Sequence, residues 1–215
     1  MLKFAVFDLD GVLLDTGEGI REAARYAARM MGYHDLPDSE WDSFVGPPVQ
    51  KSFMEHFGCS AEEAQKAADI FRDYYKQDEV LYLASPYEGI FDLLKKLKEA
   101  GVKTAVATYK REDYALKILR HFCFDDYFDV MRGADNFNKL SKGDIVEMCI
   151  EEMGAVKEET ALIGDTDNDA VGAENAGVRF IGATYGFGFR SKEDVDVFPN
   201  IGYAEDPMIL FDFFR

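Results

Sequence analysis

The stretch that decides the fold is Lys3-Phe-Ala-Val-Phe-Asp8-Leu-Asp10-Gly11-Val-Leu-Leu-Asp15, near the start of the chain. Its apolar residues, rich in Phe and Val, predict a buried β-strand. Asp8 and Asp10 follow two residues apart, so both side chains should point to the same side. Two carboxylates about 4 Å apart repel each other by about 4 kcal/mol at an effective dielectric near 20, so we expect a cation or a shared proton there. A solvated strand-end turn uses the same residue types and is the alternative.

The composition bounds the class of protein. The chain has 215 residues, 47% of them hydrophobic, and a formal net charge of −17. The hydrophobic content suffices for a sizeable core, whereas nucleic acids and anionic membranes require basic surface, so we expect neither as a partner. Three cysteines without a C-x-x-C pair indicate a reducing compartment. With no apolar run resembling a signal peptide or a membrane span, we expect a cytoplasmic protein.

Hydrophobic periodicity predicts a helical segment followed by alternating strands and helices. Residues 15–82 carry helical patterns, with Thr16 as the N-cap of the first helix and a capping box at Ser60 and Glu63. Strands are expected at 102–107, 128–131, 161–163 and 178–181, with helices between them. The pattern predicts an α/β fold with a doubly wound, mostly parallel sheet (a Rossmann-like core). Residues 1–14 and 83–215 would form this core, and residues 15–82 an inserted all-helical domain.

Three strands of the predicted core end in polar residues. The residues are Asp8 and Asp10 after the first strand, Thr108, Tyr109 and Lys110 after the second, and Asp165 and Asp169 after a later one. Parallel strands direct their carboxyl ends to one crevice, so these side chains should converge. Two acidic clusters with oxygen ligands favour a hard cation, and we expect Mg²⁺. For the second cluster a plain Asx turn is the alternative, since it lacks the pattern of an EF-hand.

An ordered set of motifs carries a family resemblance. Asp8-x-Asp10-Gly11, Thr108, Lys142 and Gly164-Asp165-x-x-x-Asp169 resemble the haloacid dehalogenase-like hydrolases. The resemblance spans almost the whole chain, and residues 15–82 look like the helical cap of that superfamily. Three further runs look like its phosphoglycolate phosphatase-type branch, although such runs also serve as turns and core: Phe44-Val-Gly-Pro-Pro48, Phe71-Arg-Asp-Tyr-Tyr75 and Tyr185-Gly-Phe-Gly188.

The resemblance implies a role for each motif residue. Asp8 would be the nucleophile that attacks phosphorus to give an aspartyl-phosphate, and Asp10 would act as acid and then as base. Mg²⁺ would be bound by Asp8, the backbone carbonyl of Asp10 and Asp165, with Asp169 close behind. Thr108 would hydrogen-bond a phosphoryl oxygen, and a lysine would stabilise the transferring group.

The lysine and the substrate contacts leave alternatives. Lys142, directly before a predicted helix, is preferred over Lys139 as the phosphoryl-binding lysine. Tyr109 stands where the family often has Asn or Ser. The chain departs from the family pattern at this residue, so the resemblance does not indicate what the Tyr109 side chain contacts. Gln50 and Arg72 also fit a solvated helix face. The expected substrate-binding residues are Thr108, Tyr109, Lys110, Gln50 and Arg72.

These features predict a Mg²⁺-dependent phosphatase for a small phosphorylated metabolite such as phosphoglycolate, a nucleotide or a sugar phosphate. The alternatives are a mutase on the same fold, which would pass the phosphoryl group to a sugar, and a non-catalytic phosphate-binding regulator. A dehalogenase is less favoured, because resemblance to a dehalogenase would not call for an acid at Asp10 or for a metal cluster. The sequence identifies neither the substrate nor the oligomeric state.

Overall fold

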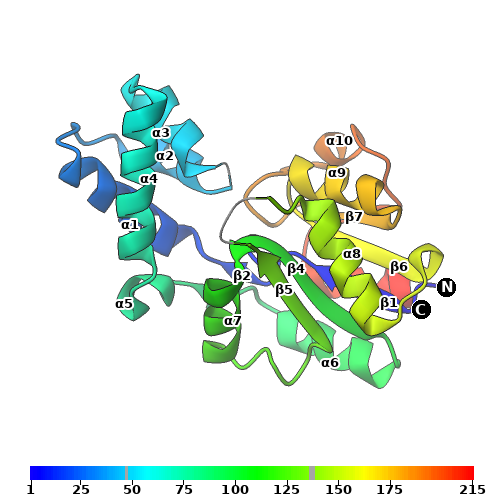
Figure 1. The fold of residues 1–215 in the computed structure, drawn as a ribbon. Coiled ribbons are helices and arrows are strands. Elements are labelled where there is room, and N and C mark those ends of the chain that lie inside the picture. The colour runs from blue at the N-terminus through cyan, green and yellow to red at the C-terminus, as the bar shows by residue number, and fades with distance from the viewer. Residues whose placement is uncertain (47, 136–138) are drawn as a thin grey trace. The chain divides into compact units, whose positions relative to one another are not determined.

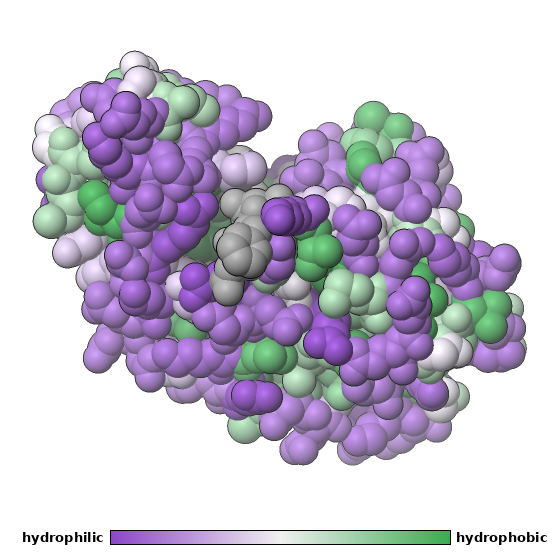
Figure 2. All heavy atoms as spheres, in the orientation of Figure 1, coloured by the Kyte–Doolittle hydropathy of each residue, from purple (hydrophilic) through white to green (hydrophobic). Residues whose placement is uncertain are grey.

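The computed structural model describes residues 1–46, 48–135 and 139–215. The chain forms two compact units (Figure 1), which we call the core unit (Met1–Asp15 with Pro86–Arg215) and the helical unit (Thr16–Ser85). Within the described ranges, no helix is both long and apolar enough to span a membrane. The face drawn in Figure 2 is mostly hydrophilic on both units, in keeping with the charge of −17.

The core unit is built on a six-stranded sheet in the order β5-β4-β1-β6-β7-β8. Every pair of neighbouring strands is parallel. The strands are β1 (Phe4–Phe7), β4 (Lys103–Arg111), β5 (Val130–Ala134), β6 (Thr160–Gly164), β7 (Arg179–Ala183) and β8 (Tyr203–Ala204). The predicted parallel α/β fold is therefore confirmed. Because β1 lies between β4 and β6, the three strands that carry the sequence motifs end side by side.

Helices cover both faces of this sheet (Figure 1). One face carries α8 (Lys142–Met153) and α9 (Asp167–Ala176), and the other carries α6 (Ile90–Glu99) and α7 (Glu112–His121). Under α8, the buried side chains of Ile145 and Cys149 join Val6, Ala105 and Leu162 of the strands in one apolar cluster. Shorter elements complete the unit: η2 (Lys157–Glu159), α10 (Lys192–Val195) and η3 (Pro207–Phe214).

The helical unit has an apolar core of its own. Its elements are α1 (Gly17–Met30), α2 (Asp38–Trp41), η1 (Asp42–Phe44), α3 (Val49–Phe57), α4 (Ala61–Tyr75) and α5 (Asp78–Leu81). Trp41, Phe44 and Phe53 are buried at its centre, and the Trp41 indole N–H donates to the Leu36 carbonyl at 3.1 Å. Two short strands, β2 (Leu14–Asp15) and β3 (Ser85–Pro86), pair with each other where the chain passes between the units.

Local predictions differ from the structure at several points. The capping box of Ser60 and Glu63 is confirmed, but Thr16 makes no side-chain capping hydrogen bond. The reason is its backbone, which has φ −103° and ψ 8° rather than the extended conformation of an N-cap. The strand predicted at 128–131 lies instead at Val130–Ala134. Pro47, within the run that resembles the family branch, lies outside the described residues.

Candidate active site

The predicted motif residues meet at the carboxyl ends of β1, β4 and β6. Phe7 pairs in register with Val106 on one side and Ile163 on the other. The Asp8 N–H continues this pattern by donating to the Ile163 carbonyl at 2.9 Å. Asp8 therefore lies at the carboxyl end of β1, next to Gly164, which precedes Asp165. The convergence expected for parallel strands holds here in detail.

Three carboxylates form the centre of the site. One oxygen each of Asp8, Asp165 and Asp169 lies within 4.8 Å of the other two. All three residues are buried, with 7%, 0% and 2% of their surface exposed. Buried like charges at this separation are costly unless cations or hydrogen bonds compensate them. The cluster is thus a place where positive charge is required.

Lys142 supplies part of that charge. Its Nζ lies 2.6 Å from Asp8 Oδ1 and 2.6 Å from Asp169 Oδ1, and its side chain is only 2% exposed. Burial lowers the pKa of Lys142, but the two carboxylates raise it by more, so the ammonium stays charged. Lys139, the other candidate, is exposed, and its backbone N–H donates to Asp135 Oδ1 at 3.0 Å. Lys142 is therefore the lysine that faces the carboxylates.

One lysine does not compensate three carboxylates. Burial, opposed by Lys142 and reinforced by Asp169, raises the pKa of Asp8 to about 7. Burial also raises the pKa of Asp165 well above its ordinary value, and the charges of Asp169 and Asp8 act in the same direction. In both carboxyl groups burial is the main cause, and the neighbouring carboxylates add to it. A divalent cation would supply the missing positive charge.

Asp165 offers an oxygen to such a cation. Its Oδ2 accepts the backbone N–H groups of Phe187 and Gly188 at 2.6 and 3.3 Å. Its Oδ1 is buried and has no hydrogen-bond partner among the described residues. A buried polar atom without a partner costs free energy, so this oxygen is the clearest indication of a ligand. An all-oxygen donor set of this kind fits Mg²⁺.

Asp169 is held by the chain itself. Its Oδ2 accepts the N–H and the hydroxyl of Thr166 at 3.1 and 2.6 Å, while its Oδ1 contacts Lys142. Thr166 and Asp169 thereby form a capping box at the start of α9. Both oxygens of Asp169 thus have protein partners, which distinguishes it from Asp165.

Asp10 and the end of β4 form the outer part of the site. The Asp10 side chain is 24% exposed, more than that of Asp8, and its Oδ1 lies 3.1 Å from Lys110 Nζ. Thr108 is 1% exposed, and its Oγ1 accepts the Lys110 N–H at 3.1 Å. An accessible carboxylate beside a buried one suits a group that exchanges protons with a ligand.

Tyr109 has a contact that its place in the sequence did not indicate. Its hydroxyl accepts the backbone N–H of Lys142 at 2.8 Å, and 46% of its surface is exposed. The N–H groups of Phe187 and Gly188, as partners of Asp165, were likewise not predicted from the sequence. The run Tyr185-Gly-Phe-Gly188 was a signal for the latter, because glycines permit close backbone approach.

The two candidates from the helical unit have partners within that unit. The Gln50 side-chain amide donates to Gln65 Oε1 at 3.3 Å. Arg72 forms an ion pair with Asp69 at 3.1 Å. Both residues remain predicted substrate contacts.

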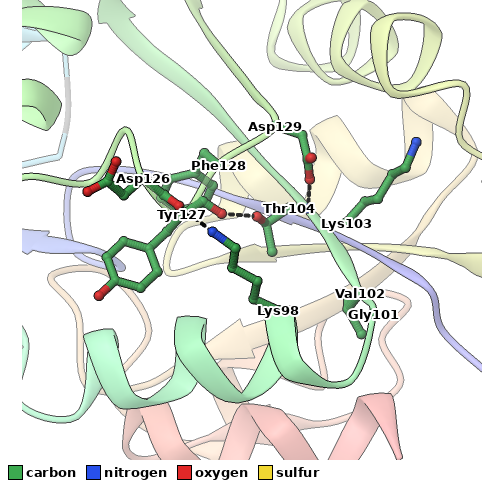
Figure 3. Close-up of a pocket in the computed structure, with 9 residues that line it drawn as sticks. All are labelled: Lys98, Gly101, Val102, Lys103, Thr104, Asp126, Tyr127, Phe128 and Asp129. Atoms are coloured by element: carbon green, nitrogen blue, oxygen red, sulfur yellow. Dashed lines mark hydrogen bonds between the residues drawn. The ribbon is translucent and has the colours of Figure 1, made fainter.

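A separate hollow of about 250 Å³ lies at the opposite end of β4 (Figure 3). The polar groups lining it bond mainly to one another. The Thr104 hydroxyl donates to the Tyr127 carbonyl at 2.6 Å, and Lys98 Nζ donates to the Asp126 carbonyl at 2.8 Å. It holds none of the motif residues.

Comparison with known proteins places these features in a family. A model described as haloacid dehalogenase-like hydrolase matches residues 5–183. A 5'-nucleotidase of Pseudomonas aeruginosa is 33% identical over 202 residues, which cover 94% of this chain and 90% of that protein. A phosphoglycolate phosphatase of Vibrio vulnificus is 29% identical over 195 residues, covering 86% and 85%. A solved structure of a haloacid dehalogenase-like family hydrolase from Streptococcus pneumoniae superposes with a TM-score of 0.90 at 27% identity, covering 100% and 99% of the two chains.

Proposed function

The chain belongs to the haloacid dehalogenase-like hydrolases, and we propose that it hydrolyses a small phosphomonoester with the help of Mg²⁺. It is a phosphatase that resembles the phosphoglycolate phosphatases. The observation that carries this proposal is the buried cluster of Asp8, Asp165 and Asp169 around Lys142, with Asp165 Oδ1 lacking a partner. Such a cluster is costly to a protein that does not use it.

We propose that Asp8, Asp165 and the backbone carbonyl of Asp10 hold Mg²⁺, with Asp169 beside them. A cation bound there would supply the positive charge that offsets repulsion between a carboxylate nucleophile and an anionic phosphate. The clamp of Phe187 and Gly188 on one oxygen of Asp165 supports this assignment, because it fixes the carboxylate and leaves Oδ1 for a ligand.

In the proposed reaction a carboxylate oxygen of Asp8 attacks phosphorus while the bond from phosphorus to the leaving oxygen breaks. Asp10 donates its proton to that leaving oxygen. Asp10 then takes a proton from water, whose oxygen attacks the phosphorus of the aspartyl-phosphate, releasing phosphate and restoring Asp8. Lys142 and Thr108 would hold phosphoryl oxygens as charge develops on them. The greater exposure of Asp10 supports its assignment as the proton carrier.

We propose that the helical unit acts as the cap that selects the substrate, with Gln50 and Arg72 as contacts. The insertion of residues 15–82 between the first and second motifs supports this assignment. A cap over the site would exclude water and large substrates, so the proposed substrate is a small phosphorylated metabolite such as phosphoglycolate, a nucleotide or a sugar phosphate.

The proposed function is tested by phosphate release from a panel of small phosphomonoesters with Mg²⁺, with a chelator and with Ca²⁺. We expect turnover with Mg²⁺, loss with the chelator and poor activation by Ca²⁺, which prefers more ligands and longer bonds. An identically purified Asp8→Asn variant controls for contaminating phosphatases. Hydrolysis that persists without metal would contradict the proposal, and conversion of a hexose phosphate to its isomer would identify a mutase instead.

Gly186→Ala is expected to weaken Mg²⁺ binding by about 10-fold or more, the usual effect of displacing a ligand's support. A Cβ on Gly186 would lie 2.4 Å from Asp165 Oδ2 and 2.4 Å from the Gly11 carbonyl oxygen, so the carboxylate or the backbone that surrounds it must shift. Calorimetric titration with Mg²⁺ measures the affinity. Gly182→Ala is the control, because its Cβ would clash with Val195 at 2.4 Å, away from the carboxylates. Equal affinities for the two variants would show that the clamp does not support the site.

A further inference from the structure

We propose that Tyr109 is a positioning residue for the phosphatase reaction, holding Lys142 in place through its hydroxyl; this inference rests on the proposed function. The sequence alone suggested a substrate contact for Tyr109. In the structure the Lys142 N–H donates a hydrogen bond of 2.8 Å to the Tyr109 hydroxyl oxygen.

The start of α8 explains why this bond is needed. The first N–H groups of a helix have no partners within it. Ser141 and Asp144 satisfy two of them by a capping box, with the Asp144 N–H donating to Ser141 Oγ at 3.2 Å and the Ser141 N–H to Asp144 Oδ2 at 2.8 Å. The N–H of Lys142 lies between them and donates to Tyr109. The hydroxyl therefore satisfies a third N–H group at the start of α8, and it comes from β4 rather than from the helix itself.

The side chain of Lys142 is held by contacts along its stem and at its ammonium group. A Cβ on Gly172 would lie 2.5 Å from Lys142 Cγ, so the aliphatic stem lies close against α9. The ammonium lies between Asp8 and Asp169 and 5.9 Å from the centre of the Tyr109 ring. Tyr109 thus contacts the main chain of Lys142 and flanks its charge, while the carboxylates hold the Nζ.

Tyr109 also links two motifs, because it directly follows Thr108 on β4. A hydrogen bond from α8 to this residue sets the distance between Thr108 and Lys142, the two groups proposed to hold phosphoryl oxygens. Small displacements of such groups lower the rate of the chemical step more than they lower ground-state binding. A positioning role therefore predicts an effect mainly on kcat.

Tyr109→Phe removes the hydroxyl and keeps the ring. We expect kcat to fall about fivefold to tenfold, the worth of about one hydrogen bond, with KM changed less than about twofold. Tyr127→Phe is the matched control, since Tyr127 lines the hollow at the opposite end of β4 (Figure 3). It should leave both constants unchanged. A rise in KM with unchanged kcat in Tyr109→Phe would overturn the proposal, because it would mark a substrate contact.

A double-mutant cycle with Lys142→Ala tests whether Tyr109 acts through the lysine. If it does, adding Tyr109→Phe to Lys142→Ala should cause no further loss of kcat, because the group being positioned is gone. If the two losses multiply, Tyr109 acts on the substrate independently and the proposal is wrong.

Amide hydrogen exchange at Lys142 gives a measurement that needs no activity. The Lys142 N–H should exchange about fivefold or more faster in Tyr109→Phe than in wild type, and at the wild-type rate in Tyr127→Phe. Unchanged exchange would overturn the proposal. If wild type hydrolyses no phosphomonoester, the proposed function fails by itself, and faster exchange still establishes that the hydroxyl holds Lys142.

Discussion

Asp8→Asn is expected to lower phosphatase activity by about 10⁴-fold or more while leaving the protein folded. The amide is nearly isosteric with the carboxylate. Its oxygen can still accept a hydrogen bond from Lys142 Nζ, which in the wild-type protein lies 2.6 Å from Asp8 Oδ1. It cannot serve as the attacking anion. The residual rate measures what the rest of the site achieves without a nucleophile.

Two measurements accompany this variant. Asp10→Asn should retain more activity, with a loss of about 10²- to 10⁴-fold, because it removes proton transfer and leaves the nucleophile. Trapping with labelled substrate should give an acid-stable phosphoprotein with wild type and none with Asp8→Asn. A rate like that of wild type in Asp8→Asn would show that the mechanism is wrong.

The stability of the same variant has a defined pH dependence in metal-free buffer. Burial raises the pKa of Asp8 from the ordinary range of a carboxyl group to about 7. A carboxyl group whose pKa is raised on folding stabilises the protein below the unfolded pKa, and that contribution is lost as pH rises through the folded pKa. Between about pH 4 and 7, wild type should therefore lose stability relative to Asp8→Asn, which thermal unfolding measures.

Lys142→Ala is expected to lower both the rate and the stability of the protein. If the ammonium faces the transferring phosphoryl group, its loss should lower kcat about 10²- to 10³-fold. It also leaves Asp8 and Asp169 buried without their cation, which should lower the free energy of unfolding by about 3–5 kcal/mol in metal-free buffer. Phosphate release and chemical denaturation measure the two effects.

Lys139→Ala is the control for this variant. Lys139 is exposed, whereas the Lys142 side chain is 2% exposed and 2.6 Å from two carboxylates. We expect Lys139→Ala to change rate and stability little, as surface substitutions usually do. A large loss in Lys139→Ala with little change in Lys142→Ala would move the assignment to Lys139.

The fold and the acidic clusters could be predicted because their signals are local. The apolar run before Asp8 and the run before Asp165 each specify a strand and the residue that ends it. Parallel topology then brings those ends together without further information. The family membership followed from the order of the same motifs.

Other features of the site depend on contacts between distant residues, which no local pattern encodes. The bond between Tyr109 and Lys142 spans 33 positions, and the clamp on Asp165 comes from Phe187, 22 positions away. The missing cap at Thr16 has a different cause, because a suitable residue type lies in an unsuitable backbone conformation. Sequence therefore indicated which groups lie at the carboxyl ends of the strands, and the structure indicated which contacts hold them.

The central place of β1 affects how the protein is made. Phe4 pairs with Lys103 on one side and Thr160 on the other, so both partner strands of β1 follow it in the sequence at a distance. Contacts so distant in sequence are slow to form and expose strand edges meanwhile. The helical unit is one continuous stretch, Thr16–Ser85, so all its internal partners emerge together. Asp8 consequently meets Asp165 and Asp169 only once β6 and the start of α9 have been synthesised.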